Sequence, residues 1–252
     1  MAMDKIRILL TVISGVCWTI VYIQGIRIGF RDKSYAIPFY ALALNFAWEL
    51  LYTFYGFRIN GLNVQNVFSA VWLTFDVGIL YTYFKFGRKY FPSLPIDPFA
   101  YAHGADDIVA QTSVCDSSGA HRLKSVPQKS KSAFIAWSVL ALITALLIQY
   151  AIRREFGVAK GAGYSAFLQN LLMSILFITM LVRRGGREGQ SLMIAISKWI
   201  GTLAPTILYG VVGEGGFPRG SFLILVTDGL CSVFDLIYIR LLAKLTRTTI
   251  RY

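Results

Sequence analysis

Five ionisable side chains stand inside otherwise apolar stretches of this sequence. They comprise four acids and one base, namely Glu49, Asp76, Lys198, Asp228 and Asp235. A charge at the centre of a bilayer costs about 2.5–3.5 kcal/mol on insertion scales, so such residues mark functional sites by default. Four carboxyls beside one lysine cannot all ionise in a dry interior, because desolvation and mutual repulsion disfavour the charged form. We therefore expect at least one acid to stay protonated near neutral pH and to serve as a proton donor.

The stretch around Glu49 places four side chains on one helical face. Their spacing is i, i+3, i+4, i+7, and they are Asn45, Trp48, Glu49 and Tyr52. Glu49 lies near the middle of an apolar run of about 20 residues, which is long enough to cross a bilayer core. This face is therefore expected to look inward, away from lipid.

The other acids allow both functional and structural interpretations. Asp228 and Asp235 are seven residues apart and so share one stripe of a helix, while Asp76 lies in the middle of a different apolar run. Each acid could be a neutral carboxyl that hydrogen-bonds a neighbouring helix. Lys198 could extend towards the membrane surface, or form an ion pair that only holds helices together. The residues alone do not choose between Asp228 and Asp235 as a functional acid.

Aromatic residues supply the second ingredient of a candidate site. Trp18 and Tyr22 are four residues apart on one helical face, and Trp48 and Tyr52 flank Glu49. Aromatic faces attract cations, although most such residues simply pack in a core or form an interfacial belt. An apolar cavity with a neutral acid and aromatic walls suits the protonation of an alkene or epoxide and the shielding of the resulting carbocation. The residues expected to line it are Trp18, Tyr22, Trp48, Tyr52, Asn170, Trp199 and Tyr238.

The elements that must position these residues are membrane helices. Of the 252 residues, 56% are hydrophobic and only 15% are charged, which is typical of an integral membrane protein. Hydropathy predicts an all-α bundle of seven transmembrane helices in a single membrane domain covering residues 1–252. The predicted spans are about 6–26, 37–56, 66–86, 133–152, 164–182, 192–212 and 221–243. Gly201, Pro205 and Gly210 predict a kinked or locally unwound sixth span.

The distribution of basic residues predicts the orientation of the bundle. With seven spans, 17 Lys and Arg residues fall on the side of the C-terminus and seven on the side of the N-terminus. The positive-inside rule then places the C-terminus in the cytoplasm and the N-terminus outside, although Lys5 and Arg7 alone would favour the reverse. The net charge of +12 therefore indicates membrane topology and not a nucleic-acid partner.

The positions of the cysteines and histidines do not predict a metal or haem site. Cys17 and Cys231 fall in apolar runs, and no C-x-x-C pair occurs. Cys115 and both histidines, His103 and His121, lie in the predicted cytoplasmic loop 87–132. That loop is expected to be either a disordered linker or a lid over the bundle. No cofactor is expected.

Four motifs resemble those of the small seven-helix integral-membrane terpene cyclases of meroterpenoid and indole-terpenoid pathways in fungi and bacteria. They are N-F-A-W-E at 45–49, F-D-L-I-Y at 234–238, F-D-V-G-I-L-Y at 75–81, and G-Q-S followed by K-W-I-G-T at 189–202. The resemblance implies that Glu49 and Asp235 carry the proton transfer. It also implies that Asp76 and Lys198, which fall in shared stretches, tune or position them, with Asp228 and Asn45 as further supporting residues.

The same resemblance implies the substrate and the location of the protein. The substrate would be a prenyl chain, often farnesyl, attached to an aromatic or indole head group. Its terminal alkene or epoxide would be protonated, and no diphosphate would leave, so no Mg²⁺ would be needed. Asp106-Asp107 begins D-D-I-V-A and lacks the third acid of a D-D-x-x-D signature. The enzyme would lie in the cell membrane of a bacterium or the endoplasmic reticulum of a fungus, with lipid and this hydrophobic substrate as its partners and no indication of its oligomeric state.

An alternative function uses the same acids as a proton relay. A seven-helix proton-coupled transporter or a receptor-like binder of small molecules would also place carboxyls inside the membrane. The sequence shows no internal repeat of the kind that marks many transporters, which counts against that alternative.

Overall fold

The computed structural model describes residues 2–62, 64–91 and 131–249, and these residues form helices and no strand. Most of the predicted loop 87–132, with its two histidines, Cys115 and Asp106-Asp107, lies outside the described residues. The helices are α1 (Ala2–Arg31), α2 (Phe39–Asn60), α3 (Val64–Phe86), the short 3-10 helix η1 (Gly87–Tyr90), α6 (Lys131–Arg184), α7 (Leu192–Pro205), the π-helix η2 (Thr206–Val212) and α8 (Phe222–Thr249). Helix therefore occupies each of the seven ranges that hydropathy predicts.

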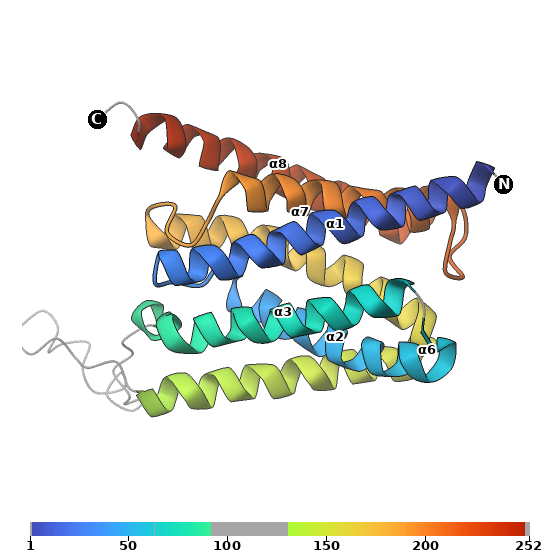
Figure 1. The fold of residues 1–252 in the computed structure, drawn as a ribbon, viewed down its shortest axis with the longest axis horizontal. Helices are drawn as coiled ribbons and strands as arrows, with labels where there is room; N and C mark the ends of the chain where they lie inside the picture. Colours follow the sequence, from blue (N-terminus) through green and yellow to red (C-terminus); the bar gives the residue numbers. More distant parts are fainter. Residues whose placement is uncertain (1, 63, 92–130, 250–252) are drawn as a thin grey trace, which may run out of the picture.

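Helix α6 reverses direction near its middle. Gly157 has φ 76° and ψ 178°, a backbone conformation that is open almost only to glycine. In a straight helix Gln149 and Gln169 would be about 30 Å apart. Instead Nε2 of Gln149 donates to Oε1 of Gln169 at 2.9 Å. The 54 residues of α6 are thus two antiparallel arms, and Figure 1 shows the yellow-green first arm and the orange-yellow second arm running in opposite directions.

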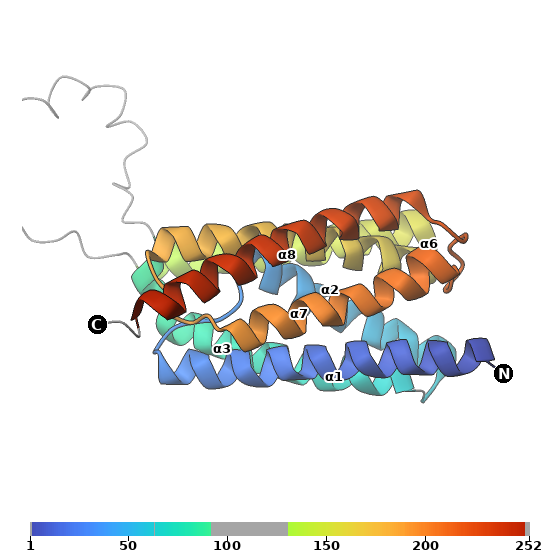
Figure 2. The same ribbon diagram turned by 90° about the horizontal axis from the view of Figure 1, so that it is seen from above.

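The helices enclose a common interior. Contacts between neighbouring elements close a ring in the order α1, α3, α2, α6, α8, α7 and back to α1. The second arm of α6 meets α8 where Oγ of Ser174 lies 3.0 Å from Sγ of Cys231. The first arm lies outside the ring and bonds to α3 through Oγ of Ser138 and the hydroxyl of Tyr83, 3.0 Å apart. Figures 1 and 2 show the long helices running side by side along one axis.

The distribution of polarity is the reverse of that in a soluble protein. The five buried ionisable residues Glu49, Asp76, Lys198, Asp228 and Asp235 are each at most 3% exposed, whereas large apolar side chains such as Leu147 (63%) and Leu9 (58%) face outward. Such an arrangement suits lipid as the surrounding solvent. Five helical stretches of the described chain are long and apolar enough to cross a bilayer: Met3–Arg31, Asn66–Tyr90, Lys131–Arg184, Leu192–Val212 and Phe222–Thr246.

Two features explain why this set has five helical stretches whereas the sequence predicts seven transmembrane spans. Lys131–Arg184 contains both arms of α6 in one stretch, and α2 is absent from the set. The sequence of α2 contains the polar side chains Asn45 and Glu49. The number of helices that cross the membrane, and the side on which each terminus lies, stay predictions.

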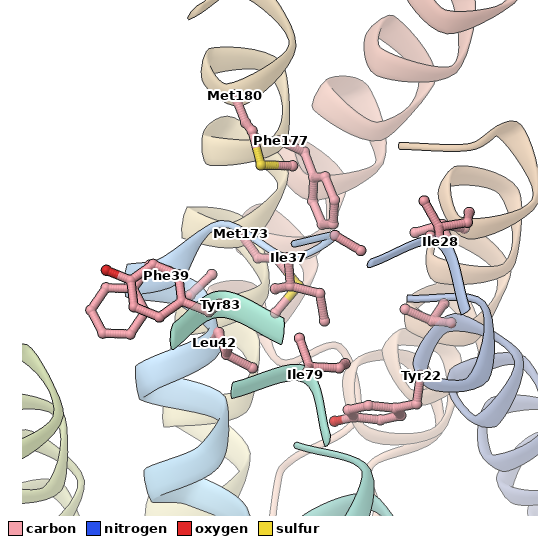
Figure 3. Close-up of a cluster of buried hydrophobic side chains, with 14 of the residues drawn as sticks. Tyr22, Ile28, Ile37, Phe39, Leu42, Ile79, Tyr83, Met173, Phe177 and Met180 are labelled. Carbon is pink, nitrogen blue, oxygen red and sulfur yellow. The ribbon is translucent and has the colours of Figure 1, made fainter. Parts of the chain in front are cut away.

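The half of the bundle that carries the C-terminus of α1 is filled by a close-packed apolar core. Tyr22, Ile37, Ile79, Met173 and Phe177 are among its members, and Figure 3 shows them pointing towards one another from α1, the segment before α2, α3 and α6. The rings of Phe39 and Tyr83 stack with centroids 3.9 Å apart. This packing fixes the helices against one another beside the polar residues described below.

The loops at this end are tied together by polar contacts. The Arg184 guanidinium lies between the rings of Tyr35 and Tyr90, 4.3 and 4.2 Å from their centroids. The backbone N–H of Gly189 donates to Oδ2 of Asp32 at 3.0 Å. Partial burial raises the pKa of the Asp32 carboxyl, but hydrogen bonds from Arg31 and from this N–H outweigh burial, so its pKa is lowered. The segment between α6 and α7 is thereby fixed to the segment between α1 and α2.

The predicted distortion of the sixth span is a π-helix that begins directly after Pro205. Proline has no N–H to donate to the carbonyl four residues earlier, which is that of Gly201. Oγ of Ser14 on α1 donates to this carbonyl at 2.8 Å and satisfies it. A Cβ at Gly201 would meet Cδ1 of Trp18 at 3.0 Å, so glycine is what allows α1 to approach this closely. Such single π turns frequently occur at functional sites.

Candidate active site

The first polar group of the interior is built around Glu49 and Asp76. Glu49 lies on α2 and Asp76 on α3, and they are 3% and 0% exposed. The two carboxyls are close enough to interact electrostatically, and Ser69 of α3 hydrogen-bonds to Glu49. Among the described residues, neither acid forms an ion pair with a lysine or arginine. Two adjacent acids without a cation are suited to hold at least one proton.

A chain of amides leads to Asp76. Nε2 of Gln149 donates to Gln169, and Nε2 of Gln169 donates to Oδ1 of Asn45 at 3.3 Å. Nδ2 of Asn45 then donates to Oδ2 of Asp76 at 2.9 Å and to the hydroxyl of Tyr22 at 2.5 Å. Residues from α6, α2, α3 and α1 are thus joined in one network with a single direction of donation. Asn45, predicted as a supporting residue, is the branch point of this network.

The second polar group is a buried ion pair between α7 and α8. Nζ of Lys198 donates to Oδ1 and Oδ2 of Asp235 at 2.9 and 2.8 Å, and to Oγ of Ser174 at 2.7 Å. The lysine and aspartate side chains are 0% and 1% exposed. Of the two structural roles left open for Lys198, extension towards the membrane surface is excluded by this burial. The pair brings together one predicted catalytic acid and its predicted supporting base.

Asp228 lies beside this pair without bonding to it. Oγ1 of Thr206 is 2.7 Å from Oδ2 of Asp228 and 2.8 Å from the carbonyl of Thr202. Asp228 is close enough to Lys198 and Asp235 to interact with both electrostatically. Thr206 is the first residue of the π-helix, so the distortion of α7 places a hydroxyl against this acid.

Each acid except Asp235 keeps one buried oxygen with no hydrogen-bond partner among the described residues. These atoms are Oε2 of Glu49, Oδ1 of Asp76 and Oδ1 of Asp228. A protonated carboxyl with a free oxygen can deliver its proton to a substrate without first breaking another bond. The three oxygens therefore mark the positions from which proton transfer is possible.

The predicted aromatic residues divide into two sets. Tyr22 belongs to the site, since it bonds to Asn45 and stacks with Trp72 and Phe75 at 6.3 and 6.1 Å. Trp18 adjoins Tyr22, with ring centroids 6.3 Å apart. These rings form one aromatic wall beside the Glu49 and Asp76 carboxyls.

The remaining predicted cavity residues have other surroundings. Nε1 of Trp48 donates to the carbonyl of Ala162 at 2.9 Å, and the Tyr52 ring packs on Trp48 with ring centroids 5.2 Å apart. Tyr238 donates to Gln190 at 2.7 Å, towards the end of the bundle that carries the C-terminus. Nε1 of Trp199 is buried and has no hydrogen-bond partner in the described part of the chain, and the backbone carbonyl of Asn170 accepts from Oγ of Ser174 at 2.9 Å.

Several residues of the two groups were missed in the sequence. They are Gln149, Gln169, Ser174 and Thr206, whose side chains are neither ionisable nor aromatic. Their signal was an uncharged polar side chain inside a predicted span, where such groups bond across helices. The weakness of that signal is that serine and threonine in a helix often bond only to their own backbone.

An apolar groove lies outside the two polar groups. It has a volume of about 390 Å³ and is lined by residues of α2 and both arms of α6, including Ala43, Leu44, Ala145 and Leu172. None of the five buried ionisable residues lines it. The predicted cavity between Glu49 and Asp235 therefore stays a prediction. In the part of the chain that the structure describes, no three His, Cys, Asp or Glu side chains are grouped to hold a metal ion.

Comparison with known proteins identifies the family. The family model of Pyr4-like transmembrane terpene cyclases matches residues 1–97 and 113–248. The Pyr4-family terpene cyclase mfmH of Annulohypoxylon moriforme is 29% identical over 202 residues, covering 79% of this chain and 68% of that protein. Terpene cyclase macJ of Penicillium terrestre is 27% identical over 238 residues, covering 91% and 79%. Terpene cyclase ascF of Acremonium egyptiacum is 28% identical over 205 residues, covering 75% and 61%.

No solved structure matches this chain. The family match covers the described helices except the last residue of α8, and it confirms the resemblance found in the sequence motifs. With its buried acids, its outward apolar side chains and this match, the chain belongs to the Pyr4-like transmembrane terpene cyclases and is a membrane-embedded enzyme.

Proposed function

We propose that this terpene cyclase acts on a prenyl chain, farnesyl in length, that is attached to an aromatic or indole head group. A carboxylic acid in the helix ring protonates the terminal alkene or epoxide of the chain. The π bonds of the chain then attack in succession and close rings, and loss of a proton ends the reaction. Glu49 and Asp235 are the residues that carry the proton transfers, and no metal ion takes part.

One observation carries this proposal. Glu49 is buried beside a second acid, has an oxygen without a hydrogen-bond partner, and bonds to no cation among the described residues. An unpaired carboxylate is costly in such a place, whereas the neutral acid is stable there and can give up its proton to a substrate. The wall of Tyr22, Trp72 and Phe75 supplies aromatic faces near the carbocation that follows.

Membership of an enzyme family removes the support for the transporter or receptor alternative. The relatives named above come from fungi, so we place the protein in the endoplasmic reticulum of a fungal cell. Lipid and the hydrophobic substrate are its proposed partners.

Microsomes that carry the chain test the proposal directly. We expect a ring-closed product, seen by mass spectrometry and chromatography, when they receive a farnesylated phenol or indole or its terminal epoxide. The same membranes with Glu49→Gln should give none, because the amide has no acidic proton. Conversion by wild type that is unaffected by Glu49→Gln would refute the role of Glu49. Absence of any ring-closed product from either type of substrate would refute the proposed substrate class.

A further inference from the structure

The hydrogen bonds around Lys198 account for all of its protons. An ammonium group has three N–H donors. They have three close acceptors, which are Oδ1 and Oδ2 of Asp235 and Oγ of Ser174, at 2.9, 2.8 and 2.7 Å. Ser174 can accept this bond because its own proton goes to the carbonyl of Asn170 at 2.9 Å. Both oxygens of Asp235 therefore accept from the ammonium group, which is the arrangement of an ion pair with a carboxylate, and each oxygen keeps a second lone pair.

The other buried acids differ from Asp235 in this respect. Glu49, Asp76 and Asp228 each have one oxygen without a hydrogen-bond partner among the described residues, and a proton can reside on it. Asp228 also contacts a hydroxyl group. Thr206 has a single O–H and two close acceptors, the Thr202 carbonyl and Oδ2 of Asp228. The hydroxyl is shared between these two acceptors, and Oδ1 of Asp228 has no partner among the described residues. The interior thus separates three acids that can hold a proton from one that is paired as a carboxylate.

We propose that Lys198 is a positioning residue that keeps Asp235 ionised, so that Glu49 supplies the proton that starts the cyclisation and Asp235 accepts the proton that ends it. This assignment rests on the proposed function of the chain. It adds a division of labour between the two acids and a role for the lysine.

The proposed proton transfers balance. The O–H bond of Glu49 breaks, and its proton bonds to the less substituted carbon of the terminal alkene through the π electrons, or to the oxygen of the epoxide. In the epoxide the C–O bond at the more substituted carbon then breaks and the oxygen stays as a hydroxyl. Either route leaves a carboxylate on Glu49 and a tertiary carbocation on the chain. Ring closure moves the positive charge along the chain without changing its number. A C–H bond next to the final cation breaks, its electron pair forms the new alkene, and an oxygen of Asp235 takes the proton. After product release, Glu49 takes up a proton from water and becomes the neutral acid again. Asp235 gives its proton to water and becomes a carboxylate again.

The ion pair also explains why the acid role does not fall on Asp235. A carboxylate held by two bonds to an ammonium group is a poor proton source, but it attracts a carbocation and can accept its proton. Ser174 of α6 and Cys231 of α8 contact the lysine from the side, with Nζ of Lys198 2.7 Å from Oγ of Ser174 and 3.8 Å from Sγ of Cys231. Lys198 therefore acts through Asp235 and not on the substrate.

The test measures two quantities separately: how fast the substrate is consumed, and which products are formed. Microsomes with wild type, Glu49→Gln, Asp235→Asn, Lys198→Met and the double variant Lys198→Met/Asp235→Asn receive the same prenylated substrate in deuterated water. Lys85→Met, a change of the same type at an exposed position, is the control. Thermal unfolding in detergent shows which variants fold. The double variant keeps the assay interpretable, because it removes both charges together.

Glu49→Gln should lower consumption by about 100-fold or more, as expected for loss of a general acid. The Lys198→Met and double variants should still consume substrate, within about tenfold of wild type, and should still incorporate the solvent deuteron of the first step. Their share of the wild-type product should fall by about tenfold or more, replaced by water-captured alcohols and by alkenes from earlier proton loss. Lys85→Met should match wild type.

Two results would overturn the assignment while leaving the proposed function standing. If a folded double variant consumes no substrate, Asp235 takes part in the starting step. If it consumes substrate and makes the wild-type product in the wild-type share, the pair is only structural. The proposed function itself fails in a different way, by the absence of ring-closed product with wild type.

Discussion

The Lys198–Asp235 pair is deeply buried. The change in the free energy of unfolding therefore depends on whether a substitution removes one partner of the pair or both. Removing one partner leaves an uncompensated charge in a dry interior, whereas removing both leaves two neutral groups. The side chains are 0% and 1% exposed, so solvent cannot screen the remaining charge. At the scale of residues, stability and chemistry are therefore coupled through one lysine.

We expect Asp235→Asn to lower the free energy of unfolding by about 3–5 kcal/mol, because it leaves the Lys198 ammonium unpaired. The double variant Lys198→Met/Asp235→Asn should recover most of that loss. Thermal or denaturant unfolding in detergent, arranged as a double-mutant cycle, measures both values. Additive effects of the two single changes would contradict a strong interaction between the side chains.

At the scale of elements, the junction of α7 and the π-helix depends on a contact with α1. Pro205 cannot donate to the Gly201 carbonyl, and Ser14 supplies the missing hydrogen bond at 2.8 Å. The absence of a Cβ at Gly201 allows the two helices to come close enough for this bond. Helix α7, which carries Lys198, and the start of the π-helix at Thr206 are thereby held against α1.

This arrangement predicts that Ser14 and Pro205 are coupled. Ser14→Ala should lower the free energy of unfolding by about 1–3 kcal/mol, because the Gly201 carbonyl is left without a donor. In a Pro205→Ala background the N–H of residue 205 can serve that carbonyl, so Ser14→Ala should cost less than about 0.5 kcal/mol. Unfolding of the four variants in detergent gives the coupling energy. Equal losses in both backgrounds would show that the serine acts in another way.

At the scale of the whole molecule, the ring of helices faces its polar residues inward from every side. α1 contributes Tyr22, α2 Glu49, α3 Asp76, α7 Lys198 and α8 Asp235. The two termini lie at opposite ends of the bundle (Figures 1 and 2). Any odd number of crossings would have this consequence, so the predicted number of seven stays a prediction.

The charge distribution predicts which end faces the cytoplasm. A glycosylation acceptor added to the N-terminus should be modified in microsomes, and a C-terminal reporter should be removed by protease added outside them, because the excess of Lys and Arg keeps the C-terminal side in the cytoplasm. Both readouts use intact membranes. A protected C-terminal reporter with an unmodified N-terminus would reverse the orientation.

Local properties of the chain determined the helices and the residues that mattered most. Hydropathy placed helix in all seven ranges, since apolar runs of this length have few other solutions in a bilayer. Helical spacing placed Asn45 and Glu49 on a common face, and both are buried. The motifs around Glu49 and Asp235 identified the family. Each of these inferences depends only on residues near one another in the chain.

The tertiary structure alone decided which residues meet. Spacing put Asp228 and Asp235 on one stripe, but the position of α7 against α8 pairs Lys198 with Asp235 and leaves Asp228 with Thr206. The reversal at Gly157 brings Gln149 onto Gln169 and completes the amide chain to Asp76. Residue spacing fixes the faces of a single helix, whereas the partner of each face depends on packing between helices that are distant in the sequence. The roles of the two acids follow from those partners.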